Sequence, residues 1–214
     1  MELYGYQEPL VDPMLDILRD PDKLLGLLAL STGTGKTVVA LELMLRANCS
    51  FGVLAPKVTL GQWLRTAKEI GVSPKFVLNP EAVRNGNRPD IVVRNSPVSF
   101  SWKALSDGDV LVLDEIHRFG APDSQLAYMA AHASAAKIRI LGLSATLADS
   151  PLKMRLLLHA ARKVPWNRFY PWAESVGCYR DQRINGHPWR PPMGRPGTQA
   201  MERLNAEFFP AFGV

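Results

Sequence analysis

Short apolar runs and amphipathic segments alternate between about residue 24 and residue 147 of the chain. The apolar runs are rich in Leu, Val and Ile and are often followed directly by turn or capping residues, which is typical of buried strands. They predict strands at 24–30, 51–56, 75–78, 90–93, 109–115 and 137–145. The segments between them have helical spacing and predict helices at 37–47, 59–70, 101–107 and 124–135. This alternation predicts an α/β fold, with a mostly parallel central sheet and helices on both faces.

The pattern changes from about residue 163. Three of the five tryptophans and a dense set of prolines lie in the stretch that follows, so long regular elements are not expected there. Aromatic residues recur throughout, which predicts a packed but irregular excursion with a flexible turn at 190–197. Helical spacing resumes at 198–209. We therefore expect a nucleotide-binding domain at 1–162 and an extension at 163–214 that ends in a helix.

Composition and charge limit the possible locations of the protein more than they limit its possible chemistry. The 214 residues have a net charge of +5 and a pI of about 9.4, which permits a polyanionic partner without requiring one. No apolar run approaches the ~18 residues that span a bilayer, and the N-terminus lacks a basic-then-apolar signal pattern. Cys49 and Cys178 form no CxxC pair, so we expect reduced thiols. We expect no membrane partner and a cytoplasmic location, or one at a nucleoid or a site of viral replication.

A glycine-rich turn joins the first apolar run to the helix that follows it. Its residues are Ser31, Thr32, Gly33, Thr34, Gly35, Lys36 and Thr37, and we assign Thr32 to Thr37 to ATP binding. Glycine permits positive φ, so successive N–H groups can curl around phosphate oxygens, and a helix N-terminus adds a positive dipole end. Lys36 would reach the β and γ phosphates, and Thr37 would ligate Mg²⁺. The pattern GxxxxGK[ST] asks for glycine where this chain has Leu30, and a strand-to-helix turn with a surface lysine is the alternative.

An apolar strand that ends in two acids supplies the matching chemistry. Asp114 and Glu115 follow an apolar run about 75 residues after the glycine-rich turn. At the carboxyl edge of a parallel sheet, one carboxylate would hold Mg²⁺ and the other would polarise the attacking water. We therefore predict Lys36, Asp114 and Glu115 as catalytic residues, with Thr37 and Asp114 as the Mg²⁺ ligands. Helix capping by the two acids is the alternative.

Three short motifs now stand in an order that resembles a known superfamily. Gly33–Thr37, Asp114–His117 and Ser144–Thr146 are similar to motifs I, II and III of superfamily 2 helicases and translocases. The sequence DEIH resembles a variant of the DEAD/DEAH box. The resemblance covers residues 4 to about 150, and it implies the first RecA-like domain of a P-loop NTPase that uses ATP and Mg²⁺.

Other segments resemble one branch of that superfamily. The sequence LAPKVTLGQW at 54–63 is similar to motif Ia of the Swi/Snf-type branch, and Tyr6-Gln7 resembles the "YQ" that precedes a helix there. The Ser-Ala-Thr turn departs from this branch, which usually has a "GTP"-like ending at motif III. The sequence MERLNAEFFPAFGV at 201–214 is loosely similar to the helix that leads out of the branch's first motor domain.

The resemblance implies roles outside the phosphate loop and the acid box. Gln7 would contact adenine, although a solvated residue before the first helix is an equal alternative. The residues implied to couple the γ-phosphate to domain movement are His117, Ser144 and Thr146, and a plain polar loop is their alternative. Nucleic-acid contacts are implied for motif Ia and for a segment near motif Ib: Pro56, Lys57, Arg94, Asn95 and Ser96. Trp63 is expected to be a core residue of an amphipathic helix.

A superfamily 2 motor needs two RecA-like domains, and one is recognised in this sequence. Nothing after residue 147 resembles the "QxxGRxxR" motif that carries the arginine finger. The second domain is therefore expected on a separate polypeptide or on a removed part of a longer chain. This chain alone should then bind ATP with Mg²⁺ weakly and hydrolyse it barely. The basic and aromatic residues after 163 would contact nucleic acid, cover the sheet edge or dock the second domain.

Two functions of different classes fit these features. The first is the ATP-binding half of a nucleic-acid-dependent ATPase, a helicase or a double-stranded-DNA translocase, with DNA favoured over RNA. The second is a catalytically weak regulatory module that binds nucleic acid or a protein. Leu30 and the missing domain favour the module, whereas Lys36-Thr37 and Asp114-Glu115 favour the enzyme. A P-loop kinase or GTPase fits less well, because we find neither acceptor-binding arginines with a lid nor an NKxD-type guanine reader.

Overall fold

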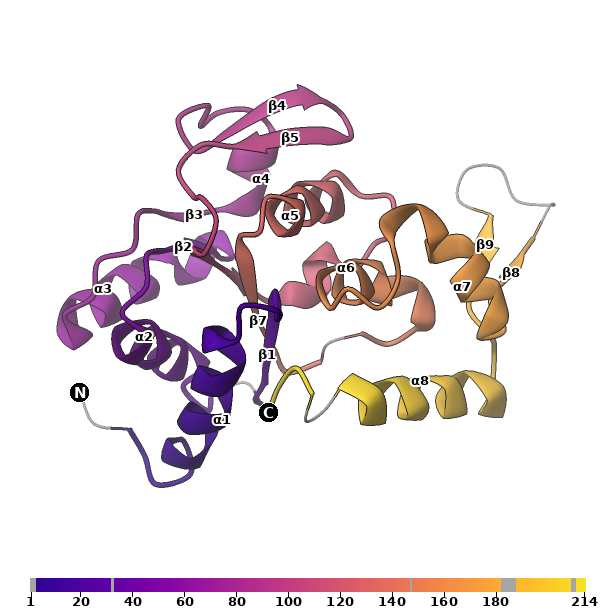
Figure 1. The fold of residues 1–214 in the computed structure, drawn as a ribbon, viewed down its shortest axis with the longest axis horizontal. Coiled ribbons are helices and arrows are strands. Elements are labelled where there is room, and N and C mark those ends of the chain that lie inside the picture. The colour runs from indigo at the N-terminus through magenta and orange to yellow at the C-terminus, as the bar shows by residue number, and fades with distance from the viewer. Residues whose placement is uncertain (1–2, 32, 147, 182–187, 209–210) are drawn as a thin grey trace.

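A parallel sheet of five strands forms the centre of the molecule, in the order β1-β7-β6-β2-β3 (Figure 1). The computed structural model describes residues 3–31, 33–146, 148–181, 188–208 and 211–214. The strands of this sheet are β1 (Leu25–Ala29), β2 (Phe51–Leu54), β3 (Val77–Leu78), β6 (Val110–Asp114) and β7 (Arg139–Ser144). Their continuous apolar runs are explained by burial on both faces, since every residue of β2 and β6 is buried. The predicted α/β fold with a parallel sheet is confirmed.

Helices cover both faces of the sheet, and each face has its own apolar cluster. On one face lie α1 (Glu8–Arg19), α2 (Lys36–Ala47) and α3 (Leu60–Ile70). On the other face lie α4 (Pro80–Arg84), α5 (Gln125–Ala135) and α6 (Arg155–Ala160). The two groups stand on opposite sides of the central strands (Figure 1). In the described part of the chain, no helix combines the length and the apolarity that crossing a bilayer requires.

Two expected elements between residues 90 and 107 are wrong. The segment placed in the central sheet is β4 (Val92–Ser96), which pairs in antiparallel fashion with β5 (Ser99–Trp102) outside that sheet. The helix expected at 101–107 does not form, because Phe100 and Trp102 alternate with serines and this two-residue period favours a strand. Phe100 is buried against the core, and the Trp102 indole Nε1 donates to the Met129 carbonyl of α5 at 3.0 Å.

The C-terminal part has more regular structure than its prolines suggest. It contains α7 (Phe169–Ser175), a hairpin of β8 (Tyr179–Arg180) and β9 (Trp189–Arg190), and α8 (Arg195–Phe208). The flexible turn expected at 190–197 is wrong at its end, since α8 begins at Arg195. Buried residues of α7 and α8 belong to the same apolar cluster as α5 and α6.

The last residues return to the central sheet beside β1. Gly213 forms a parallel bridge with Leu27, whose N–H donates to the Phe212 carbonyl at 2.7 Å. The Ala29 N–H donates to the Val214 carbonyl at 2.7 Å. A Cβ atom at Gly213 would lie 2.2 Å from the Leu27 oxygen, so this close approach needs glycine. The strand that leads to the glycine-rich turn is therefore hydrogen-bonded on both edges.

Candidate active site

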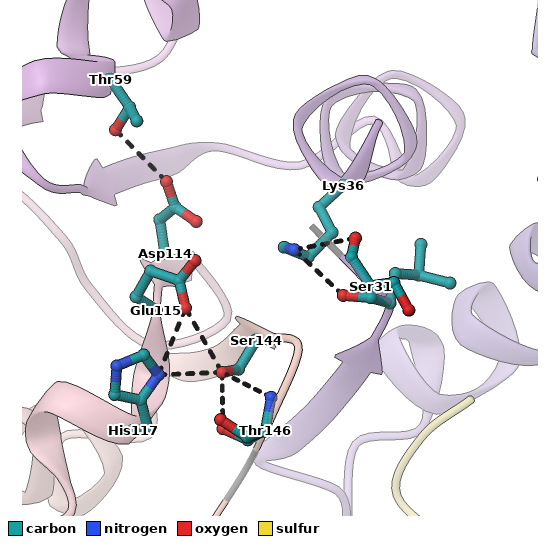
Figure 2. Close-up of polar contacts among 9 residues, drawn as sticks. Ser31, Lys36, Thr59, Asp114, Glu115, His117, Ser144 and Thr146 are labelled. Carbon is teal, nitrogen blue, oxygen red and sulfur yellow. Dashed lines mark hydrogen bonds and ion pairs between the residues drawn. The ribbon is translucent and has the colours of Figure 1, made fainter. Parts of the chain in front are cut away.

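The carboxyl ends of three neighbouring strands bring the three expected motifs together. In the register of the sheet, Ala29 at the end of β1 lies opposite Ser144 of β7, and Asp114 at the end of β6 lies opposite Leu143. The glycine-rich turn, the acid pair and the Ser-Ala-Thr turn follow these three strand ends directly. They therefore face one edge of the sheet, as Figure 2 shows for Lys36, Asp114 and Ser144.

The glycine-rich turn has the geometry of an anion cradle. Gly33 and Gly35 have φ of 83° and 78°, a region that side chains other than glycine rarely adopt. Gly35 is the N-cap of α2 and no side chain caps that helix end, so its first N–H groups remain available to an anion. Thr37 lies in the first turn of α2. Thr32 lies outside the described residues.

The Lys36 side chain folds back and bonds to the backbone at the start of the turn. Its ammonium Nζ donates to the carbonyls of Leu30 at 3.0 Å and Ser31 at 3.2 Å (Figure 2). The Leu30 side chain packs against the apolar cluster on the α1–α3 face while its carbonyl points to the lysine. Leucine is therefore tolerated where the usual pattern has glycine, because this position uses its backbone oxygen and fills the core with its side chain.

Gln7 is buried against the phosphate loop, with 1% of its surface exposed. Its Nε2 donates to the Thr34 carbonyl at 2.8 Å, and its Oε1 accepts from the Tyr4 N–H at 2.9 Å. A Cβ atom at Gly35 would lie 2.5 Å from Gln7 Nε2, so glycine at that position also makes room for the amide. The alternative of a solvated Gln7 is excluded, and its amide holds the loop from the side of α1.

Asp114 is the buried acid of the pair, with 8% of its surface exposed. Its Oδ2 accepts from the Trp63 indole Nε1 at 3.0 Å and lies 3.4 Å from the Thr59 hydroxyl. Burial raises the pKa of the Asp114 carboxyl and the neighbouring Glu115 adds to this, while the Trp63 hydrogen bond and the Lys36 charge act in the opposite direction. A carboxylate in this setting gains from a divalent cation, which would offset the cost of burial.

Sequence reasoning missed Thr59 and Trp63 as residues of this site. Trp63 is fully buried in α3, as expected for a core residue, but its indole N–H also needs an acceptor. The available signal was the position of both residues in the motif Ia segment, one helical turn apart. The pattern gave no indication of which acceptor they would meet.

Glu115 and the Ser-Ala-Thr turn form one hydrogen-bonded network. Glu115 has a left-handed backbone (φ 59°, ψ 57°) directly after the end of β6. Its Oε2 lies 3.2 Å from His117 Nδ1 and 3.4 Å from the Ser144 hydroxyl (Figure 2). The Ser144 Oγ also lies 3.0 Å from His117 Nδ1 and 2.6 Å from the Thr146 carbonyl. The structure thus brings together the three residues expected to couple the acid pair to movement.

The expected nucleic-acid residues fall into two separate groups. Pro56 and Lys57 follow β2 at the same edge of the sheet as the acid pair, where Lys57 is exposed at the start of a 3-10 turn (Lys57–Thr59). The other group, Arg94, Asn95 and Ser96, lies on the β4–β5 hairpin outside the central sheet. Asn95 Nδ2 donates to Ser101 Oγ within that hairpin at 2.8 Å.

Comparisons with known proteins agree with this arrangement. The family model described as "Type III restriction enzyme, res subunit" matches residues 1–149. A protein of African swine fever virus, named as a candidate ATP-dependent RNA helicase (QP509L), is 28% identical over 199 residues. That alignment covers 87% of this chain and 37% of the viral protein, so the chain spans little more than a third of that relative.

Two solved helicase structures also resemble the chain. The Hef helicase domain of Pyrococcus furiosus has a TM-score of 0.46 at 16% identity and covers 73% of this chain and 35% of its own. Dbp5 of S. cerevisiae, solved bound to Gle1, has a TM-score of 0.44 at 18% identity and covers 72% of this chain and 43% of its own. On the family match, which takes in all three motifs, the chain belongs to the type III restriction enzyme res subunit family and contains the first RecA-like domain of a superfamily 2 helicase.

Proposed function

We propose that this chain is the ATP-binding half of a nucleic-acid-dependent ATPase that moves on DNA, as a helicase or a duplex translocase. The observation that carries the proposal is the convergence of Lys36, Asp114 and Glu115 at the carboxyl edge of the sheet, where β1 and β6 lie on either side of β7. The description of the family as a restriction enzyme subunit supports DNA, whereas the name of the viral relative speaks for RNA. The likeness of 54–63 to motif Ia supports a place near the Swi/Snf-type branch.

The donor set fits ATP with Mg²⁺. ATP would supply the phosphoanhydride bond, and Mg²⁺ would neutralise charge on its β and γ phosphates. Lys36 would exchange the Leu30 and Ser31 carbonyls for phosphate oxygens, since the same ammonium cannot serve both sets fully. Thr37 and Asp114 would hold the cation, and Gly33 to Thr37 would offer N–H groups to the phosphates. Gln7 would hold the loop in register and face the adenine side.

Glu115 is the general base of this proposal. Its carboxylate would orient the attacking water and take up its proton at Oε2, the oxygen that already faces Ser144 and His117. The Ser144 hydroxyl has a single proton to donate, and both the Thr146 carbonyl and the Glu115 carboxylate are within reach. A change at Glu115 would therefore alter the hydrogen bond to the Ser-Ala-Thr turn. That turn would pass the change to a second RecA-like domain supplied by another polypeptide or another part of the protein.

The decisive experiment measures ATP hydrolysis and binding of a fluorescent ATP analogue in the presence of single-stranded DNA, duplex DNA or RNA. Each measurement is made with this chain alone and after addition of a second RecA-like domain. We expect binding but little turnover from the chain alone, and a gain of about 10³-fold or more when the second domain adds an arginine finger. Duplex or single-stranded DNA should stimulate turnover more than RNA does.

Lys36→Ala tests the site itself, and Lys68→Ala, an exposed lysine on α3, is its control. Lys36→Ala should abolish analogue binding and turnover, while Lys68→Ala should leave both unchanged. If nucleic-acid binding and biological activity both survived Lys36→Ala, the chain would be a binding module and not an ATPase half. Strong nucleic-acid-stimulated turnover by the chain alone would contradict the need for a second domain.

A further inference from the structure

A buried hydrogen bond joins the motif Ia segment to the acid pair. The Trp63 indole Nε1 and the Asp114 Oδ2 atom are 3.0 Å apart, and both residues are buried. The interaction spans from α3 to the end of β6, across a sequence separation of 51 residues. An N–H group that donates to a carboxylate in a buried setting forms a stronger and more directional bond than one at the surface.

Core packing alone does not account for this bond. Trp63 belongs to the buried apolar cluster of the α1–α3 face, and a phenyl ring would satisfy that role without an N–H group. The indole instead directs its donor at a carboxylate that burial already makes costly to ionise. A single donor on Oδ2 limits the rotation of the carboxyl group and leaves the Oδ1 atom on the side of the phosphate loop (Figure 2).

Thr59 supplies a second, weaker restraint on the same oxygen. Its hydroxyl lies 3.4 Å from Asp114 Oδ2 and 3.0 Å from the Pro56 carbonyl. One hydroxyl proton cannot donate to both acceptors at full strength, and the shorter distance favours Pro56. The Thr59 hydroxyl therefore donates mainly to the Pro56 carbonyl and only weakly to Asp114 Oδ2. Trp63 provides most of the restraint on the orientation of the carboxylate.

We propose that Trp63 and Thr59 are positioning residues that orient the Asp114 carboxylate for Mg²⁺. The inference rests on the proposed function, in which Asp114 is a ligand of the cation. Groups that hydrogen-bond to a metal ligand fix its orientation, and their removal typically weakens metal binding about 10- to 100-fold. The motif Ia segment thus orients the carboxylate through Oδ2, in addition to any contact that its exposed turn makes with nucleic acid.

The test compares the affinity of a fluorescent ATP analogue in excess Mg²⁺ with its affinity in EDTA. The ratio of the two dissociation constants, here called the Mg²⁺ effect, is measured for the wild-type chain and four variants. Trp63→Phe removes the indole N–H and keeps an aromatic ring, and Thr59→Val removes the hydroxyl and keeps the shape. Asp114→Asn removes the charge of the ligand. Trp102→Phe is the matched control, because its indole also donates to a protein oxygen at 3.0 Å but lies on the β4–β5 hairpin.

We expect Trp63→Phe to lower the Mg²⁺ effect about tenfold and Thr59→Val to lower it about two- to threefold. Asp114→Asn should reduce the ratio to about one, and Trp102→Phe should not change it. The affinity in EDTA should be the same for the wild-type, Trp63→Phe, Thr59→Val and Trp102→Phe proteins, which separates a positioning role from damage to the loop. If Trp63→Phe proves too unstable to purify, Thr59→Val carries the test alone, and rescue by Thr59→Ser must accompany it.

Two failures are distinguishable. If Asp114→Asn lost the Mg²⁺ effect while Trp63→Phe and Thr59→Val kept the wild-type ratio, the positioning role would be wrong and the proposed function would stand. The positioning role would also be wrong if both variants lost affinity equally in Mg²⁺ and in EDTA. If the wild-type chain showed no Mg²⁺ effect, or Asp114→Asn retained it, the assignment of Asp114 as a cation ligand would fail.

Discussion

Two buried charges, Asp114 and Arg155, are treated by the fold in opposite ways. Both have less than a tenth of their surface exposed. Arg155 donates to the Pro122 carbonyl at 2.9 Å, the Asp123 carboxylate at 2.6 Å and the Trp166 carbonyl at 3.0 Å, and its guanidinium lies 4.0 Å from the Trp166 ring. Among the residues that the structure describes, Asp114 receives hydrogen bonds from the two neutral donors described above, and both of them reach the same oxygen.

The two charges differ in the number and the charge of their described partners. A guanidinium with one anionic partner, two carbonyl acceptors and a surrounding of aromatic rings is stabilised in place. It ties α6 to the loop that follows the acid pair and to the segment that leads into α7. The described hydrogen-bond donors to the Asp114 carboxylate are both neutral, and burial raises the pKa of this carboxyl above its usual value.

The largest effect is expected from Arg155→Met, which keeps an unbranched apolar side chain and removes the cation. It leaves the Pro122 and Trp166 carbonyls without this donor and should lower the free energy of unfolding by about 3 kcal/mol. For a domain of this size that corresponds to a fall in Tm of roughly 6–12 °C. Chemical denaturation measures the loss, with Arg65→Met on the exposed face of α3 as the control. An unchanged Tm would remove the contrast between the two charges.

The residues around Asp114 and Arg155 could be predicted only in part from the sequence. That Lys36, Asp114 and Glu115 lie at one edge of the sheet was predictable, because their motifs directly follow apolar strands that run parallel. The Trp63 donor was not, because it meets Asp114 across 51 residues and a helical pattern shows only that its face is buried. Arg155 was missed for the same reason: its partners come from the loop at 122–123 and from Trp166, which no periodicity connects.

A smaller effect of opposite sign is expected from Asp114→Asn. The amide can still accept the Trp63 hydrogen bond and has no charge to desolvate, so the free energy of unfolding at neutral pH should rise by about 1 kcal/mol. Thermal denaturation should show this as a gain in Tm of about 2–4 °C. The same variant loses the Mg²⁺ effect, so that stability and function move in opposite directions.

The pH dependence of the Tm difference between Asp114→Asn and the wild type shows whether the ionised Asp114 carboxyl stabilises or destabilises the fold. Because burial raises the pKa of Asp114 above its ordinary value of 3.8, the wild-type carboxyl favours the folded state below that pH and loses this contribution as pH rises through the folded pKa. The Asn side chain does not titrate. The Tm advantage of the variant should therefore be absent near pH 4 and below, grow as the pH rises, and level off by neutral pH. A constant advantage at every pH would mean that the charge is not its cause.

The fold was predictable where periodicity and packing agree. Four of the five parallel strands follow from apolar runs that are mostly buried on both faces, while the two residues of β3 are half-buried; α2, α3 and α5 follow from their apolar spacing. The β4–β5 hairpin was missed because the apolar run 90–93 resembles a buried strand while Phe100 and Trp102 reveal their two-residue period over only four residues. The bridge of Gly213 to Leu27 forms because the chain returns to the sheet after α8. No local sequence pattern predicts such a return.

The smallest effect is expected from Tyr170→Phe, which tests whether Tyr170 and Arg155 stabilise the fold through the same partner, Asp123. The Tyr170 hydroxyl also donates to Asp123, and burial together with this bond raises the pKa of the hydroxyl above its usual value, so that it stays a neutral donor. Tyr170→Phe should cost about 0.5 kcal/mol in chemical denaturation, because the carboxylate is partly hydrated. In the double variant with Arg155→Met the two losses should not add, since both side chains reach the same carboxylate. Simple additivity would mean that Tyr170 and Arg155 act on Asp123 independently, and the charge at Arg155 would then be held mainly by its carbonyl and ring contacts.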